Sequence, residues 1–461
     1  MTPTSPLSDA PPSSSGTANE VSVRKWLTYV TVEGACATVF IVLTGGAFLT
    51  GLALHLGASD FEIGLLAAIP FLAQVMQLLS AYLVDRTGHR KAITLWSSVV
   101  ARQLWWLVLP LLFLAGGWRL AAFLTLVALS QAAIMVATPS WMSWMADLVP
   151  GKLRGRYFGY RSALLALVTV AVTIIGGIVL DEFRDIGKDN VGFAVIVGAG
   201  CLLALIAALL LSRTPDHSAR RHKVEASWYR LSEPLRDASF RKLLRVFVVW
   251  NFALGLAAAF FSVHMLTNLR MSFTQVSLYI SLHALTGILF NRPWGTVIDR
   301  FGSKPVVAFC AFGITFVPLI WWLPRPDFLW ILAVEAVYSG TLWTGAILAA
   351  FNIPIANSPK KGRTAYLAMF SVIPGLAFFV ASVIGGIVAE NLSHFRWEIG
   401  RQTIVNYHLL FTLSSALRFV AALMALKYRE PKEKSISQMT QYMGRSILRW
   451  LSTGRRSLPW P

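Results

Sequence analysis

Charged residues are scarce in this chain of 461 residues. Asp, Glu, Lys and Arg together make up 14% of it, whereas hydrophobic residues make up 56%. Soluble domains carry a charge on about a quarter of their residues, so this composition excludes an ordinary soluble protein. Cysteine is also rare, and Cys36, Cys201 and Cys310 lie too far apart for a disulfide framework or a metal-binding spacing. We therefore expect no metal site and no cofactor.

Several motifs that would indicate an enzyme or an ATP-driven machine are missing. The sequence has no Gly-x-x-x-x-Gly-Lys-Ser/Thr loop for nucleotide phosphates, no His-Glu-x-x-His and no Gly-x-Ser-x-Gly. The lack of the phosphate loop argues against ATP as the energy source. The lack of the other two disfavours a membrane enzyme with its catalytic residues at one membrane face.

Long apolar runs dominate the rest of the chain. About 20 apolar residues are needed to cross a bilayer as a helix, and the runs do not alternate as the strands of a membrane barrel do. The predicted fold class is therefore all-α: a polytopic membrane protein with twelve transmembrane helices in two six-helix, pseudo-symmetric bundles. The predicted spans are 27–52, 61–84, 92–115, 119–143, 158–180, 192–212, 244–266, 274–297, 305–323, 328–352, 365–389 and 405–427.

The distribution of Lys and Arg predicts the orientation. If both termini are cytoplasmic, the inner segments hold 30 of these residues and the outer loops hold 7. This bias favours cytoplasmic termini by the positive-inside rule, with the protein in a bacterial inner membrane. It also accounts for the net charge of +19, which we interpret as contact with anionic lipids and not with nucleic acid.

Composition divides the chain into five parts. Residues 1–23 are rich in Pro, Ser and Thr and are predicted to be disordered, and residues 428–461 form a basic tail with an amphipathic stretch that predicts an interfacial helix. A six-helix bundle is expected over 24–212 and another over 244–427, joined by a cytoplasmic linker, 213–243, with an amphipathic segment. We expect the chain to act as a monomer.

One short loop occurs twice, 214 residues apart. It follows the second predicted span and the eighth, and each copy reads small-x-x-x-Asp-Arg-x-Gly-x-basic. A repeat at half-chain spacing indicates two similar halves that can rock against each other. A second repeat, Ile-Gly-Gly-Ile-Val, begins at Ile175 and again at Ile384. The loop residues singled out are Asp85, Arg86, Gly88 and Arg90 in the first copy, and Gly295, Asp299, Arg300, Gly302 and Lys304 in the second.

These features resemble the major facilitator superfamily over nearly the whole chain. The loop pattern of that family is Gly-x-x-x-Asp-Arg-x-Gly-Arg-Arg/Lys; the second copy, with Ser303 at the first basic position, matches it well, and the first has Ala81 and His89 at two of its positions. The resemblance implies two bundles around a central cavity lined mainly by spans 1, 4, 7 and 10. It also implies alternating access.

The Asp that both loop copies contain has a physical interpretation. An Asp at the inner end of a span can accept hydrogen bonds from the start of a neighbouring helix, where an anion is favoured. Such a contact can form in one state and break in the other, which predicts a gating role. The alternative is that the loops are only basic anchors at the membrane surface.

Polar residues inside the spans are candidates for the transport pathway, because a charge at bilayer depth is costly unless it is paired. Glu33 is the first choice as a proton carrier and Glu335 the second, since a buried carboxyl group can load and release a proton. For Arg102 and Arg418, structural pairing is equally consistent with the sequence. Arg161 and Arg292 are expected to extend to the membrane surface. The further candidates are Gln131, Asn251 and Tyr338.

The sequence thus predicts a secondary active transporter that moves a small organic solute, with coupling to protons favoured. The alternatives are a lipid or amphiphile flippase or efflux pump of the same fold, and a receptor that does not transport. Span five carries Gly176-Gly177 and lacks the Gly-Pro pair of the family's drug–proton antiporters, which disfavours drug efflux.

Overall fold

The structure is a computed structural model, and it describes residues 15–149, 153–215, 233–359, 363–427 and 435–453. Within these residues, twelve helical segments are long and apolar enough to cross a membrane, and each corresponds to one predicted span. The prediction of an all-α polytopic fold is therefore confirmed.

The first six spans form the N-terminal half, and several of them are interrupted. The first span breaks at Gly45-Gly46, where Gly46 has a φ of 53° that favours glycine, and the third tightens into a short 3₁₀ turn. The elements of this half are α1 (Ser15–Leu43), α2 (Gly46–His55), α3 (Asp60–Ala73), α4 (Met76–Thr87), α5 (Arg90–Gln103), the 3₁₀ turn Leu104–Leu107, α6 (Val108–Leu111), α7 (Trp118–Leu148), α8 (Arg154–Asp185) and α9 (Asp189–Ser212).

The last six spans form the C-terminal half. The seventh span ends in a π-helical turn, a feature that often marks functional sites. The elements are α10 (Glu233–Arg236), α11 (Ala238–Gly255), α12 (Ala258–Val263), the π-helix His264–Asn268, α13 (Phe273–Phe301), α14 (Ser303–Thr315), α15 (Val317–Ile320), α16 (Ile331–Ala356), α17 (Arg363–Asn391), β1 (Arg396–Ile399), β2 (Gln402–Val405), α18 (Asn406–Lys427) and α19 (Ile436–Thr453).

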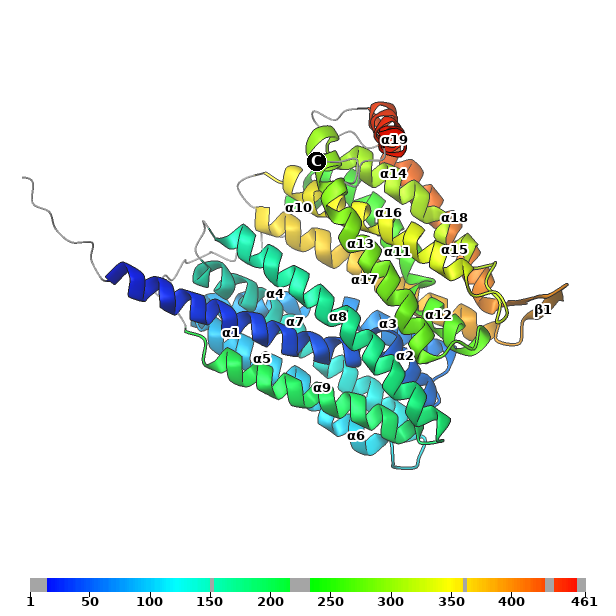
Figure 1. The fold of residues 1–461 in the computed structure, drawn as a ribbon, viewed down its shortest axis with the longest axis horizontal. Coiled ribbons are helices and arrows are strands. Elements are labelled where there is room, and N and C mark those ends of the chain that lie inside the picture. Colours follow the sequence, from blue (N-terminus) through cyan, green and yellow to red (C-terminus); the bar gives the residue numbers. More distant parts are fainter. Residues whose placement is uncertain (1–14, 150–152, 216–232, 360–362, 428–434, 454–461) are drawn as a thin grey trace, which may run out of the picture.

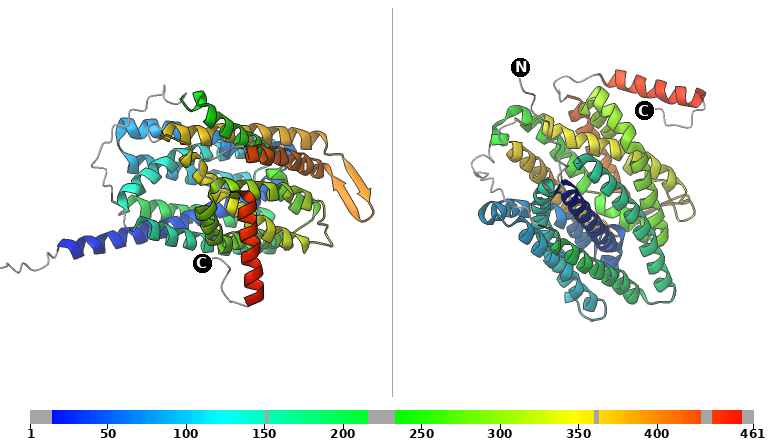
Figure 2. Two further views of the ribbon diagram at one scale, coloured as in Figure 1. Left: turned by 90° about the horizontal axis from the view of Figure 1, so that it is seen from above. Right: turned by 60° about the vertical axis from the view of Figure 1, so that its left-hand side comes forward.

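The helices of both halves run broadly along one axis (Figure 1). The start of α1 and the short helix α10 lie at one end of this axis, which we call the linker end. The antiparallel hairpin of β1 and β2 projects from the opposite end, which we call the hairpin end. The tail helix α19 runs across the direction of the spans, on the outside of the C-terminal half (Figure 2).

Three regions differ from the sequence-based expectations. Residues 15–23, expected to be disordered, belong to α1, whereas 1–14 lie outside the described residues. Residues 238–243, expected in a surface-lying linker, start the seventh span instead: Asp237 caps α11, and Phe240 and Leu243 are buried against Ile353 and Tyr366. The hairpin in the last loop was not expected, because its strands are only four residues each.

The tail helix α19 has an apolar face that packs on the protein. Met439 is fully buried in a cluster with Trp294 and Phe301, and Met443 packs on the same cluster. The guanidinium of Arg300 lies 4.3 Å from the ring centroid of Tyr442. Part of the face that was expected to lie on lipid therefore covers α13 and α14.

Candidate functional site

A carboxylate at the end of the fifth span binds the start of the eighth. Asp181, in the last turns of α8, accepts hydrogen bonds from the backbone N–H groups of Phe273 and Thr274, both at 2.8 Å. These two groups belong to the first turn of α13, where backbone donors lack partners within the helix and the helix dipole favours an anion. Asp181 therefore joins the N-terminal half to the C-terminal half at the hairpin end.

The eleventh and second spans are joined in the same way. Glu390, near the end of α17, accepts a hydrogen bond of 3.1 Å from the backbone N–H of Phe61 in the first turn of α3. Beside it, Asp60 accepts hydrogen bonds from the Tyr407 hydroxyl at 2.6 Å and from the Asn406 amide at 3.1 Å, both on α18. These bonds again cross between the halves at the hairpin end.

The repeated Gly-Gly pair allows these helices to approach. A Cβ at Gly177 would lie 2.5 Å from Ser277 Oγ and 2.8 Å from the carbonyl oxygen of Phe273 on α13. A Cβ at Gly386 would lie 3.0 Å from the carbonyl oxygen of Phe61 on α3. The second Ile-Gly-Gly-Ile-Val copy thus repeats both a sequence and a contact, because each copy packs on the other half.

The hydrophobic clusters also join the two halves at the hairpin end and stay separate toward the linker end. At the hairpin end, one cluster contains residues of both halves, such as Leu52 and Phe123 with Phe260 and Phe411. Toward the linker end, separate clusters form around Trp144 in the N-terminal half and Phe240 in the C-terminal half. Among the described residues, the two halves are therefore held together mainly at the hairpin end.

Glu33 lies in a buried charge cluster with two arginines. Its carboxylate is 3.7 Å from Arg102 Nη1 on α5 and 3.8 Å from Arg161 Nη2 on α8. The Arg161 guanidinium also lies 5.0 Å from the ring centroid of Trp141 on α7, and it crosses α1 over Gly34, where a Cβ would be only 2.2 Å from Nη2. The expectation that Arg161 extends to the membrane surface is wrong, since this glycine opens a path toward Glu33.

Glu335 has different surroundings. It is only 1% exposed on α16, and its carboxylate accepts a hydrogen bond of 2.6 Å from the Tyr279 hydroxyl on α13. The Tyr279 ring contacts Trp321, which in turn contacts His264 of the π-helical turn. No ion pair of Glu335 is found in the described part of the chain.

The remaining candidates do not converge on these carboxylates. Gln131 is half-buried on α7, and the Asn251 amide donates to the Phe247 carbonyl of its own helix at 2.8 Å. Arg418 is buried on α18, and its Nε has no hydrogen-bond partner within the described residues. The predicted set is thus spread over several places, with Glu33 and Arg102 brought together.

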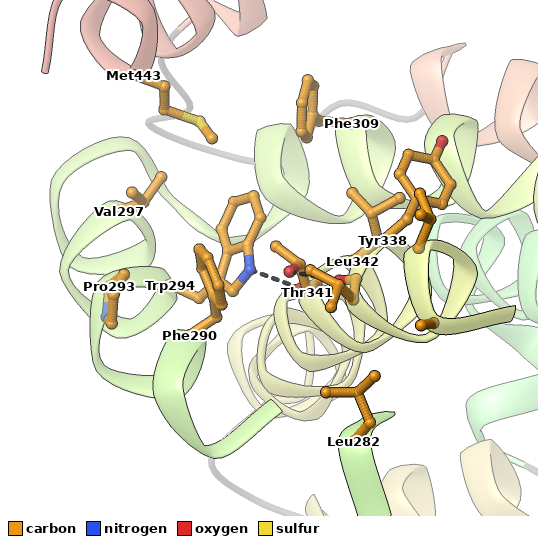
Figure 3. Close-up of a pocket in the computed structure, with 13 residues that line it drawn as sticks. Leu282, Phe290, Pro293, Trp294, Val297, Phe309, Tyr338, Thr341, Leu342 and Met443 are labelled. Carbon is orange, nitrogen blue, oxygen red and sulfur yellow. Dashed lines mark hydrogen bonds between the residues drawn. The ribbon is translucent and has the colours of Figure 1, made fainter. Parts of the chain in front are cut away.

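Tyr338, one turn from Glu335 on α16, has a different hydrogen-bond partner. Its hydroxyl donates to the Gly313 carbonyl at 2.9 Å, and its ring lines an open groove of about 750 Å³ between α13, α14 and α16 (Figure 3). Trp294 of α13 and Met443 of α19 line the same groove. The lining is apolar and lacks the convergent polar groups that orient a small polar solute.

The two copies of the repeated loop have distinct environments. Gly88, with a φ of 70°, ends α4, and Arg86 donates to the Tyr82 hydroxyl at 3.1 Å in the same helix; the side chain of Asp85 lies outside the described residues. In the second loop, Gly302 has a φ of 93°, Asp299 is exposed and Arg300 lies over Tyr442. Of the other loop residues, Lys304 is buried, and Arg90 and Gly295 are half-buried.

Sequence reasoning missed the residues that join the halves, namely Asp60, Asp181, Glu390, Asn406 and Tyr407. A signal was present, because Asp181 and Glu390 are 209 residues apart, as are the two Gly-Gly pairs. The capping boxes at Ser59 and Ser272 also mark equivalent helix starts in the two halves.

Comparison with protein families agrees with this arrangement. The model of the Major Facilitator Superfamily matches residues 34–264 and 252–460, nearly the whole chain. The chain belongs to the major facilitator superfamily. It is an integral membrane protein of a transporter family, as the twelve apolar helices also indicate.

Individual relatives are distant. The chain is 25% identical over 185 residues to the tetracycline resistance protein, class H, of Pasteurella multocida, covering 39% of this chain and 44% of the relative. It is 28% identical over 239 residues to the minor myo-inositol transporter IolF of Bacillus subtilis (strain 168), covering 48% of this chain and 51% of the relative. The chain thus spans about half the length of the curated relatives it matches.

Among solved structures, the fold is similar to that of the nucleoside transporter NupG. A crystal structure of a NupG variant has a TM-score of 0.69 with 12% sequence identity, and the match covers 88% of this chain and all of that one. Identity this low supports the fold alone.

Proposed function

We propose that this superfamily member is a secondary active transporter that moves a small organic solute across a bacterial inner membrane by alternating access. The observation that carries the proposal is the pair of equivalent contacts at the hairpin end, Asp181 on the start of α13 and Glu390 on the start of α3. Two halves joined at one end by polar contacts and glycine packing can separate there and close at the other end.

The excess of basic residues on the linker side supports cytoplasmic termini. In that orientation the hairpin end faces outward, and the closed contacts belong to an inward-facing state. The loops that contain Asp85 and Asp299 lie at the opposite end, where we expect them to close when the hairpin end opens.

Proton coupling is the second part of the proposal, and Glu335 is the favoured carrier. Adding a proton to Glu33 would leave two buried guanidinium ions without a counter-ion, which is costly at membrane depth. Glu335 instead has the Tyr279 hydroxyl as its hydrogen-bond partner. His264, 2% exposed, and His408 lie close together, with 5.0 Å between their ring centroids.

The apolar groove of Tyr338 and Trp294 favours one alternative, a flippase or efflux pump for lipids or other amphiphiles. An acyl chain fits an open apolar groove better than a polar solute does.

Counterflow in proteoliposomes tests the transport proposal. Purified protein is reconstituted, loaded with each member of a library of polar solutes, and offered the same labelled solute outside. We expect trans-acceleration for one chemical class and none with empty liposomes. Movement of fluorescent lipid between leaflets, with no solute exchanged, would favour the flippase and overturn the solute proposal.

A further inference from the structure

The cluster of Glu33, Arg102 and Arg161 holds more positive than negative charge. Two arginines from α5 and α8 lie beside a single carboxylate from α1, so the cluster carries a net charge of +1. The side chains of Arg102 and Arg161 are 8% and 14% exposed. A buried charge without a counter-ion destabilises a membrane protein by several kcal/mol, so its retention indicates a function.

The guanidinium groups also keep unused hydrogen-bond donors. Arg102 Nε and Nη1 and Arg161 Nε are buried and have no hydrogen-bond partner within the described residues. Both distances to the Glu33 carboxylate, 3.7 and 3.8 Å, exceed hydrogen-bonding length. A guanidinium presents its donors as a rigid planar fork that matches a carboxylate, so the unused donors are suited to an anion.

The fold does not require this cluster, because the other half lacks it. At the repeat offset of 214 residues, Phe316 stands in the position of Arg102, and at the offset of 209 residues, Phe370 stands in the position of Arg161. Both positions of the C-terminal half therefore carry an apolar residue, Phe316 being 43% exposed and Phe370 half-buried. A structural need of the superfamily fold would apply to both halves.

We infer that Arg102 and Arg161 form the binding site for a small organic anion that carries a single negative charge, such as a monocarboxylate. This inference rests on the proposed function, since it names the substrate class of the transporter. One negative charge brings the loaded site to neutrality, which lowers the cost of enclosing it in the membrane. The Glu33 carboxylate balances one of the two positive charges, which limits the site to a monoanion.

The test measures whether anions stabilise the purified full-length chain in nanodiscs of neutral phosphatidylcholine. The probes are lactate and benzoate, each paired with its neutral amide, at constant ionic strength. A ligand that binds the folded protein raises its unfolding temperature in a concentration-dependent manner. We compare the concentration that gives half of the effect within each variant, so that any intrinsic loss of stability cancels.

The variants change the charge of the cluster in steps. Arg161→Gln makes the cluster neutral and should weaken the binding of the effective carboxylate by at least about tenfold, since a hydrogen bond to a charged group contributes about 1.5–3 kcal/mol. Glu33→Gln raises the charge to +2 and should strengthen binding.

The double variant Glu33→Gln/Arg161→Gln restores +1 and should recover part of the affinity, which keeps the test valid if one single variant does not fold. Arg292→Gln, at an exposed position on α13, is the control and should bind as the parent does.

Each outcome decides the inference. Affinity for the carboxylate but not for its amide, following the charge of the cluster, supports it. Equal effects of carboxylate and amide, or equal affinity in Arg161→Gln and the parent, overturn it. Stabilisation by added phosphatidylglycerol alone, lost in Arg161→Gln, would assign the cluster to a lipid headgroup and also overturn it.

The same proteins separate this inference from the transport proposal. If counterflow exchanges a neutral solute and Arg161→Gln leaves that exchange unchanged, transport stands and the anion site falls. If a carboxylate binds as described but no solute in the library is exchanged, the anion site stands and the transport proposal falls.

Discussion

Asp181 and Glu390 are equivalent residues that bind across the molecule in opposite directions. Asp181 belongs to the N-terminal half and binds the start of α13 in the C-terminal half, whereas Glu390 belongs to the C-terminal half and binds the start of α3 in the N-terminal half. The carboxylates are 209 residues apart in the sequence. The internal repeat has therefore produced a reciprocal pair of contacts, so that opening the hairpin end requires both to break.

The first prediction concerns this pair. Asp181→Asn and Glu390→Gln keep the size of each side chain but remove the charge that interacts with a helix start, a contribution of about 1 kcal/mol. We expect each to raise opening at the hairpin end roughly fivefold. The readout is the rate at which an impermeant maleimide labels Ser277→Cys in a background without native cysteines. Glu182→Gln, exposed and adjacent to Asp181, is the matched control; labelling no faster than in this control would contradict the prediction.

The second prediction concerns the close approach of α8 and α13. The side chain of Gly177→Val would collide with the backbone of Phe273, which cannot move aside without separating the helices. We expect the hairpin end to stay open and exchange to fall more than about tenfold, while expression is kept. Gly198→Val on α9, where a Cβ would meet nothing within 4 Å, is the control. Normal exchange by Gly177→Val would show that the close contact is not part of the cycle.

The third prediction concerns the driving ion. Glu335→Gln removes the only proton-binding group of that side chain but keeps a partner for the Tyr279 hydroxyl, so the fold should be preserved. Accumulation of substrate driven by a pH gradient should be lost, whereas exchange, which needs no net proton movement, should remain within about twofold of the parent. Glu398→Gln on the exposed hairpin is the control. Normal uphill accumulation in both Glu335→Gln and Glu33→Gln would rule out both carboxylates as the coupling site.

The fourth prediction concerns the repeated loops. Asp85→Asn and Asp299→Asn should lower the transport rate severalfold while leaving substrate affinity unchanged, because a conformational equilibrium is shifted and no ligand contact is lost. Counterflow gives the rate, and ligand-induced stabilisation gives the affinity. Transport at the parental rate by both variants would reduce the loops to membrane anchors.

The fifth prediction concerns orientation. A cysteine at Glu398 in β1 should react with an impermeant maleimide in intact cells, and a cysteine at Ala226 in the linker should react only after the cells are permeabilised. Labelling of the linker in intact cells would reverse the orientation and make the hairpin end cytoplasmic.

The sequence predicts the spans and the repeat because both follow from local patterns. The length of each apolar run predicts a helix, and the residues shared by the two loop copies reveal the repeat. The pattern does not tell which side chains meet across the halves. In the sequence, nothing but their spacing distinguishes Asp181 and Glu390 from other acidic residues at helix ends, although their hydrogen bonds close the hairpin end.

The position of a residue along its helix also does not determine where its side chain lies. Arg161 was expected at the membrane surface because it lies near the end of its span, but a neighbouring glycine on another helix leaves space for it to turn inward. Tyr338 lies one turn further along α16 than Glu335, but its hydroxyl donates to the Gly313 carbonyl, whereas the Glu335 carboxylate binds the Tyr279 hydroxyl. Such outcomes depend on the shape of the packed neighbour and not on position in the sequence.

The glycine beneath Arg161 also has an evolutionary consequence. Any side chain at position 34 would displace the Arg161 guanidinium from its place beside Glu33, so the two positions are linked through this contact. Across descendants of a common ancestor, a glycine at 34 should be inherited together with an arginine at 161, and lineages that replaced one should have replaced the other. A joint pattern of this kind would mark which branches of the family kept this buried charge cluster.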